Sequence, residues 1–240
     1  SDIHGNIEAF NECLDYIDID TNDNLLVLLG DYVDNGYYSK EILLKVMDLE
    51  KKYPENIITL LGNHDEDFYY WLHNIYEYYE INNETAQSFF TDNEIVNSYN
   101  NNLALQTLFK NKYPNIVTWF NKKINEKRYF ESEHAIYVHA GISEPEGDEN
   151  EQKDFWKLFT SEDTYTHKYP ATTGKFFKDI ISGHIYSYEV AENESYFGKI
   201  YYDGLSHYFI DGHTSKSNKI PILMYDTETK TYTFLNELGG

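Results

Sequence analysis

The sequence predicts an α/β fold in a single domain over residues 1–240. Two short apolar runs, at 25–29 and 57–61, each end in a glycine followed by polar side chains. Buried strands of an α/β sheet read this way when they present ligands at their carboxyl ends. Apolar residues at helical spacing over 42–49 lie between the two runs. The first third of the chain is therefore expected to be a β-α-β unit.

The remaining elements follow from periodicity. A helix is expected over 7–17, where apolar residues recur at helical spacing, and the helix over 42–49 should stop near Pro54. The run 135–138 predicts a strand ahead of His139. Beyond Lys178 further strands are expected at 180–181, 199–202, 208–210, 222–225 and 231–235, with a hairpin connection at 226–230.

Two segments differ from this pattern. Residues 66–130 are rich in Asn and Tyr, with helical stretches at 68–75 and 103–109. We expect this segment to be a helical insertion that caps the site and helps to select the substrate. The segment 143–153 is acidic and is expected to be a solvated loop.

Charge and cysteine content exclude several classes. A formal net charge of −22 argues against nucleic-acid or anionic-membrane partners, which need clustered Lys and Arg. No apolar run is long enough for a membrane helix. The single cysteine, Cys13, fits a reducing, cytoplasmic compartment and is expected to be a small buried side chain. Oligomeric state is left open.

Five short motifs pair a glycine with a hard oxygen or an imidazole, the donors that divalent metals bind. A glycine lets the backbone turn sharply, so the side chains beside it can converge on one point. The motifs are Asp2-Ile3-His4-Gly5-Asn6, Gly30-Asp31-Tyr32-Val33-Asp34-Asn35-Gly36, Gly62-Asn63-His64-Asp65, His139-Ala140-Gly141 and Gly183-His184.

In order and spelling, the motifs resemble those of the calcineurin-like metallophosphoesterase superfamily, and within it the phosphoprotein-phosphatase branch. That resemblance implies a four-layer metallophosphoesterase fold, with two mixed β-sheets packed together and flanked by helices. Because the family places a strand before its first motif, we expect a short upstream strand to be missing before Ser1.

The resemblance also implies a dinuclear centre with a bridging carboxylate. Its ligands would be Asp2, His4 and Asp31 for one ion, and Asp31, Asn63, His139 and His184 for the other. The ions would be Mn, Fe or Zn, because this donor set suits all three and does not identify the metal. Manganese is the ion we would load first.

Two further residues receive catalytic roles from the resemblance. His64 would be the general acid that protonates the leaving oxygen, and Asp34 would hold its other ring nitrogen. Nucleophilic attack would come from a metal-activated hydroxide.

The chain departs from the family pattern at its phosphate-contacting arginines. Asn35 stands in place of one, and the segment 155–159 lacks the other. Arg128 is the only arginine in the chain. Lysine lacks the bidentate fork of a guanidinium, so it is an imperfect replacement. The lysines that could substitute are Lys157, Lys168 and Lys175.

The other histidines match no ligand of the family and are expected to be surface or satisfied side chains; they are His73, His134, His167, His207 and His213. Among them, His213 would gain interest if the C-terminal sheet folds over the site.

The sequence therefore predicts hydrolysis of a phosphate ester. A phosphorylated protein carrying phosphoserine or phosphothreonine, or a similar phosphomonoester, is the first choice of substrate. A dinucleoside polyphosphate such as diadenosine tetraphosphate is the alternative. A non-catalytic, metal-holding binding module is the third reading, which the presence of a general acid disfavours.

Overall fold

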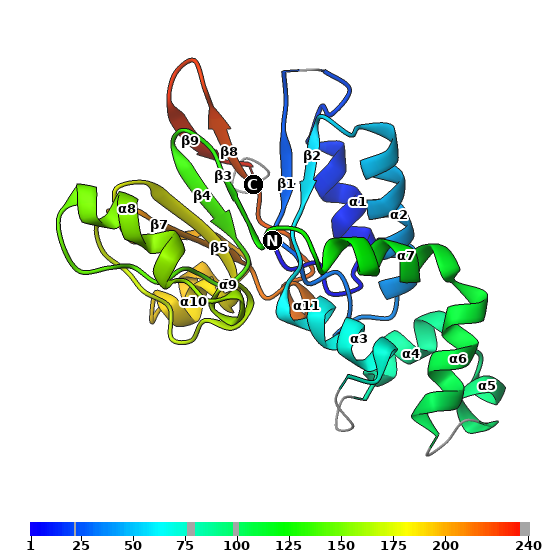
Figure 1. Ribbon diagram of the computed structural model, residues 1–240. Coiled ribbons are helices and arrows are strands. Elements are labelled where there is room, and N and C mark those ends of the chain that lie inside the picture. The colour runs from blue at the N-terminus through cyan, green and yellow to red at the C-terminus, as the bar shows by residue number, and fades with distance from the viewer. Residues whose placement is uncertain (22, 76–79, 98–100, 236–240) are drawn as a thin grey trace.

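Two β-sheets packed face to face form the centre of the molecule, and helices cover both outer faces (Figure 1). The computed structural model describes residues 1–21, 23–75, 80–97 and 101–235. The layers run helix, sheet, sheet, helix.

The first sheet pairs β1 (Leu26–Leu28) with β2 (Ile57–Thr59) in parallel. Helices α1 (Ile7–Asp15) and α2 (Ser39–Lys52) cover its outer face (Figure 1). Their apolar sides enter the largest hydrophobic cluster of the molecule. The fully buried members from these helices are Phe10, Ile42, Leu43 and Val46.

The second sheet is mixed. Its order is β3-β4-β5-β7-β6, parallel in the middle and antiparallel at both edges. The strands are β3 (Tyr129–Glu131), β4 (Ala135–Val138), β5 (Asp179–Tyr186), β6 (Tyr201–Tyr202) and β7 (His207–Asp211). Helices α8 (Glu149–Phe159) and α9 (Glu162–His167) cover the outer face through Trp156 and Tyr165.

The faces between the sheets form a separate apolar cluster. Leu29 and Leu60, at the ends of the first sheet's strands, pack against Ile181 and Ile210 of the second. A C-terminal hairpin of β8 (Leu223–Asp226) and β9 (Thr231–Phe234) adds side chains to this cluster. Short helices α10 (Ser187–Val190), η1 (Glu194–Tyr196) and α11 (Thr214–Ser217) lie in the connections.

Between β2 and β3, the described residues form five helices. They are α3 (Asn63–His73), α4 (Asn83–Phe89), α5 (Asp92–Asn97), α6 (Asn102–Lys112) and α7 (Pro114–Lys123). Phe68 of α3 lies at the centre of their aromatic packing, with its ring centroid 5.3 Å from those of Phe109 and Phe120. Within the described residues, no helix combines the length and apolar character needed to cross a membrane.

The predicted strands and helices recur with small shifts at their ends, but the expected loop over 143–153 is wrong in its second half. Residues from Glu149 onward are the first turns of α8. Asp148 caps this helix by accepting from the N–H groups of Asn150 and Glu151, and Glu151 accepts from the N–H of Asp148 in return. The acidic residues there form a capping box, which compensates for backbone groups that a helix end leaves unpaired.

The lone arginine is a structural residue. Arg128 is buried, and its Nε donates to Glu66 Oε1 at 2.5 Å. Its remaining N–H groups donate to carbonyl oxygens at the end of α7, including that of Ile124 at 2.9 Å. On its other oxygen, Glu66 accepts from the Thr166 hydroxyl at 2.8 Å. This pair therefore ties α3 to α7 and to α9.

We expect Arg128→Ala to destabilise the protein strongly, because it leaves Glu66 as an uncompensated buried charge. Removing one partner of a buried ion pair typically costs about 3–5 kcal/mol. Urea denaturation followed by circular dichroism measures this loss in the free energy of unfolding.

Lys122→Ala is the matched control, because Lys122 pairs with Glu126 at 3.3 Å on the exposed side of the same region. Exposed pairs contribute roughly 0–1 kcal/mol. Similar losses for the two variants would contradict the structural role of Arg128.

Candidate metal centre

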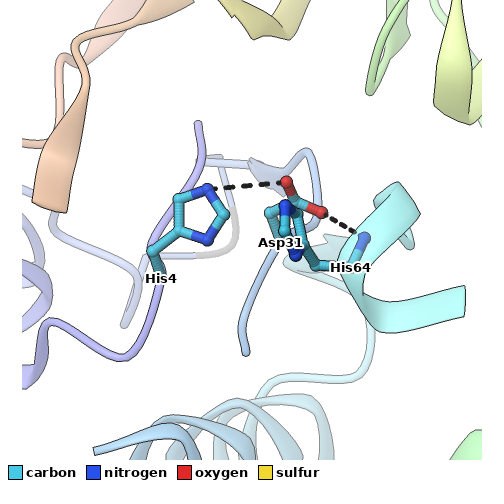
Figure 2. Close-up of side chains that lie close together, drawn as sticks. All are labelled: His4, Asp31 and His64. Atoms are coloured by element: carbon cyan, nitrogen blue, oxygen red, sulfur yellow. Dashed lines mark hydrogen bonds and ion pairs between the residues drawn. The ribbon is translucent and has the colours of Figure 1, made fainter. Parts of the chain in front are cut away.

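The ends of four strands and the turn before α1 bring the predicted site residues together. Asp31 follows β1, Asn63 and His64 open α3 after β2, and His139 follows β4. His184 lies within β5 at the point where its pairing with β7 shifts register. His4 comes from the turn before α1, and Figure 2 shows it facing Asp31, with His64 on the other side of that carboxylate.

Asp65 holds the two strand ends in place. Its buried carboxylate accepts from the N–H groups of Asp31 at 2.7 Å, Tyr32 at 2.9 Å and Gly62 at 3.0 Å. Asp31 adopts a left-handed backbone conformation with φ 55°, which is uncommon for a residue with a side chain. A Cβ at Gly62 would come within 2.0 Å of Asp31 Oδ1, so this position requires glycine.

The Asp31 carboxylate lies at the centre of the cluster. Its Oδ2 is 3.6 Å from Nε2 of His4 and 3.5 Å from Nε2 of His139. Its Oδ1 accepts from the backbone N–H of His64 at 3.1 Å (Figure 2). Asp31 therefore faces both halves of the predicted site.

Asn63, His139, His184 and Asp2 complete the cluster. Asn63 Oδ1 is 3.0 Å from His139 Nε2 and 3.0 Å from His184 Nδ1. The backbone N–H of His184 donates to both oxygens of Asp2, at 3.2 and 3.1 Å. All six residues predicted as ligands thus lie in one connected cluster.

The imidazole tautomers fit a cation between these groups. Nδ1 of His4 is 3.1 Å from the Val33 carbonyl, and Nδ1 of His139 is 3.1 Å from the Leu29 carbonyl. A carbonyl only accepts, so each Nδ1 carries the proton and each neutral ring turns the lone pair of Nε2 inward. Those lone pairs face oxygens of Asp31 and Asn63 that cannot donate. A positive ion satisfies such an arrangement of donors.

Two groups of side chains could each hold an ion, and Asp31 belongs to both. One is His4, Asp31 and His64, and the other is Asp2, Asp31 and His139, with the ligand atoms of each group within 4.8 Å of one another. This division differs from the expected one in pairing Asp2 with His139 and in including His64. The assignment of each ligand to one of two ions remains a prediction.

The electrostatics of the cluster point the same way. Burial lowers the pKa of His139 to about 3, so its ring is neutral and available as a ligand at physiological pH. Burial raises the pKa of Asp31 well above its usual range, and the nearby carboxylates of Asp2 and Asp65 raise it further. Concentrating buried carboxylates in this way is costly without a compensating cation.

His64 is held by Asp34. Its Nδ1 is 2.9 Å from Asp34 Oδ2, while Asp34 Oδ1 accepts from the Thr85 hydroxyl at 2.6 Å. Burial by itself lowers the pKa of His64, but the carboxylates of Asp31 and Asp34 raise it to about 10. Asp34 therefore fixes the orientation of the ring through Nδ1.

The positions expected to contact phosphate are engaged elsewhere. The Asn35 amide lies 3.3 Å from Nδ1 of His4. Lys157 pairs with Glu131 at 2.5 Å. Lys168 donates to the Ile142 carbonyl at 2.6 Å and pairs with Glu144. Neither of these two lysines is free to replace a phosphate-binding arginine.

His167, at the end of α9, is a further histidine with an electrostatic effect on a predicted ligand. The two residues before it make hydrogen bonds to other segments. The Tyr165 carbonyl accepts from the N–H of Ala140 at 2.8 Å, and the Thr166 hydroxyl donates to Glu66. The His167 ring is half-buried, with Nδ1 2.9 Å from the Thr166 hydroxyl. Burial lowers the pKa of His184, the Asp2 carboxylate raises it, and a charge on His167 lowers it again, so the two rings are within electrostatic reach.

Sequence reasoning missed several residues that shape the site. Asp65 is part of a recognised motif, but nothing in the sequence shows that its carboxylate joins two strand ends. Thr85 reaches Asp34 from α4, far along the chain, without any sequence signal. Asp211, at the end of β7, is buried beside Asp2, and burial raises its pKa well above the usual range.

Comparison with known proteins gives local and structural matches. The chain is 39% identical over 70 residues to the serine/threonine-protein phosphatase SIT4 of Candida albicans, covering 27% of this chain and 21% of that protein. It is 41% identical over 64 residues to the serine/threonine-protein phosphatase PP1-1 of Saccharomyces cerevisiae, with the same coverage. The matched stretch spans about a fifth of the length of these curated relatives.

Two solved structures share the fold. One, a candidate diadenosine tetraphosphatase, superposes with a TM-score of 0.53 at 15% identity, covering 98% of this chain and 90% of that one. The other is a serine/threonine phosphatase from Saccharomyces cerevisiae with similarity to human phosphatase PP5. It gives a TM-score of 0.50 at 14% identity, covering 88% of this chain and 64% of that one.

The expected fold class is confirmed by these matches and by the four layers described above. A family model for the calcineurin-like phosphoesterases matches residues 1–217, which includes every residue of the cluster around Asp31. The chain belongs to the calcineurin-like phosphoesterase family.

Proposed function

We propose that this protein is a metal-dependent phosphatase that hydrolyses phosphate esters with two divalent ions at the Asp31 cluster. The observation that supports this most is the convergence of two ligand groups on one shared carboxylate, with neutral imidazole lone pairs facing inward. Ions bound there would polarise a phosphate ester and activate a water molecule for attack. The free, buried Cys13 supports a reducing, cytoplasmic location.

In this proposal the protein's own groups orient the substrate and move the proton. Asp34 accepts from Nδ1 of His64 and so leaves Nε2 to deliver a proton to the leaving oxygen. Thr85 fixes the other oxygen of Asp34. His167, at the rim, contacts the phosphoryl oxygens in place of an arginine.

Two substrate classes have support. A phosphoserine or phosphothreonine protein is favoured by the local matches to serine/threonine phosphatases. A dinucleoside polyphosphate is favoured by the stacked rings of Tyr186 and His213, whose centroids are 3.8 Å apart, because a nucleobase can stack on such rings. The 66–130 segment remains, in our proposal, the cap that helps to select between them.

We expect His64→Ala to lower kcat for p-nitrophenyl phosphate by roughly 10²- to 10⁴-fold, because general acid catalysis is lost. The assay uses protein loaded with Mn²⁺, beside the same protein treated with a chelator. His73→Ala, at the other end of α3, is the matched control and should keep its activity. Turnover that survives both chelation and His64→Ala would contradict the proposed function.

We expect Asp31→Asn to lose both bound ions, because Asp31 belongs to both ligand groups. Asp2→Asn should lose one, since Asp2 belongs to a single group. Equilibrium dialysis followed by elemental analysis of manganese measures this without any activity assay. Asp34→Asn is the control and should retain two ions, since its carboxylate faces His64 and Thr85. Two ions retained by Asp31→Asn would rule out the shared ligand.

We expect His167→Ala to weaken competitive inhibition by inorganic phosphate roughly 10- to 100-fold. The variant loses one hydrogen bond to a charged group, and such a bond contributes about 1.5–3 kcal/mol. Manganese content should not change. His134→Ala is the control, because His134 lies at the start of β4 and stacks on Tyr225. Unchanged phosphate inhibition in His167→Ala would show that another group binds the phosphoryl oxygens.

A further inference from the structure

Aromatic side chains continue the edge of the second sheet beyond the metal cluster. The parallel neighbours β5 and β7 end on the same side. After His184, β5 ends at Tyr186, and after Asp211, the end of β7 leads to His213. Thr214, next to His213, donates from its hydroxyl to the carbonyl of Asp2 at 2.7 Å. This bond joins the segment that carries His213 to Asp2, one of the predicted metal ligands.

The rings of Tyr186, Tyr188 and His213 are nearly parallel. The Tyr188 hydroxyl is 3.2 Å from Nδ1 of His213, and the planes of these two rings differ by 11°. The Tyr186 ring stacks on His213 with centroids 3.8 Å apart and planes 3° apart. It is also nearly parallel to Tyr188, at 13°.

The Tyr186 side chain is only partly buried, although it stacks on His213. Apart from Tyr188, no other ring among the described residues contacts Tyr186. All three rings are half-exposed, and Phe197, which packs edge-on against the stack, is 39% exposed.

The fold also fixes the orientation of the stack. His213 has a left-handed backbone with φ 56°, and its N–H donates to the buried Asp211 at 2.8 Å. Such a conformation is uncommon for histidine and is stable only where its surroundings enforce it. The carboxylates of Glu189 and Glu194 lie near Tyr188. A second anionic group is disfavoured beside them, whereas a neutral planar ring is not.

We propose that the substrate's nucleobase binds to Tyr186, Tyr188 and His213 while its phosphate lies at the Asp31 cluster. This inference rests on the proposed phosphatase function and selects, within it, nucleoside phosphates and dinucleoside polyphosphates over aliphatic phosphate esters. The base would stack on the partly exposed ring of Tyr186, while the ions and His167 would hold the phosphate. Stacking of a base on an aromatic side chain contributes about 1–3 kcal/mol, or roughly 5- to 150-fold in affinity.

The test measures kcat/KM of the Mn²⁺-loaded protein on two substrates. Diadenosine tetraphosphate carries a base near the phosphate, and a phosphoserine peptide without aromatic residues does not. We expect Tyr186→Leu to lower kcat/KM for diadenosine tetraphosphate roughly 5- to 150-fold, through KM, and to leave the peptide unchanged. Tyr186→Phe keeps the ring and should behave as the unmodified protein on both substrates.

Tyr202→Leu is the matched control, since Tyr202 stacks on Tyr208 at the opposite end of the same sheet. It should leave both activities unchanged. Equal loss on both substrates in Tyr186→Leu, or equal activity of Tyr186→Leu and the unmodified protein on diadenosine tetraphosphate, would overturn the nucleobase site. A higher kcat/KM for the peptide than for diadenosine tetraphosphate in the unmodified protein would overturn the proposed substrate preference and favour the phosphoprotein class.

The p-nitrophenyl phosphate assay tests the phosphatase function independently of the nucleobase site. Absence of metal-dependent turnover of this substrate would contradict the proposed phosphatase function. The nucleobase site would then be contradicted as well if adenosine monophosphate, measured by calorimetry, bound no more tightly than inorganic phosphate.

Discussion

One buried carboxylate, that of Asp65, determines where two strands of the fold end. It accepts from the backbone N–H groups of Asp31, Tyr32 and Gly62, which belong to the segments that follow β1 and β2. Parallel strands leave such groups unpaired where their ladder stops, and unpaired buried N–H groups are costly. By satisfying three of them at once, Asp65 fixes the turn that brings Asp31 and Asn63 together. The other predicted ligands lie around Asp31 and Asn63, whose positions depend on these hydrogen bonds of Asp65.

The same region concentrates buried negative charge. Asp2, Asp31 and Asp65 are all buried, in a protein with a formal net charge of −22. The single arginine is committed to Glu66, and Lys168 to Glu144. Two divalent ions, if bound there as we propose, would leave a local charge of roughly +2 against the carboxylates of Asp2 and Asp31 by valence counting, and would invert the field where an anionic substrate would bind.

Many residues of this site could be predicted because each lies in a short motif that is recognisable from its own stretch of sequence. Each strand that contributes a ligand ends in a short motif, and the apolar run before the motif predicts the strand itself. The cluster around Asp31 therefore contains all the residues selected from the sequence. The start of α8 also has a local signal, because Asp148 and Glu151 have the spacing of a capping box. The high negative charge of the same segment is typical of a solvated loop, and that feature led to the wrong prediction.

What could not be predicted depends on contacts between distant segments. Thr85 reaches Asp34 only because α4 packs against α2, and neither segment's sequence hints at the other. His213 resembles any strand-end histidine until β7 is known to lie beside β5. Local motifs define where metal ligands converge, whereas the groups that surround a bound substrate come from the way layers and connections pack.

This distinction bears on the absence of the two phosphate-contacting arginines. A guanidinium binds a phosphate in a fixed, bidentate geometry and so tolerates little change in the orientation of the ester. An imidazole offers a single donor on the substrate side when its other nitrogen is held, as Nδ1 of His167 is held by Thr166. Orientation must then come from another part of the substrate. The Tyr186 ring is two residues beyond His184 in β5. If a nucleobase stacks on it as we propose, that contact would supply the orientation that a guanidinium would otherwise give at the phosphate.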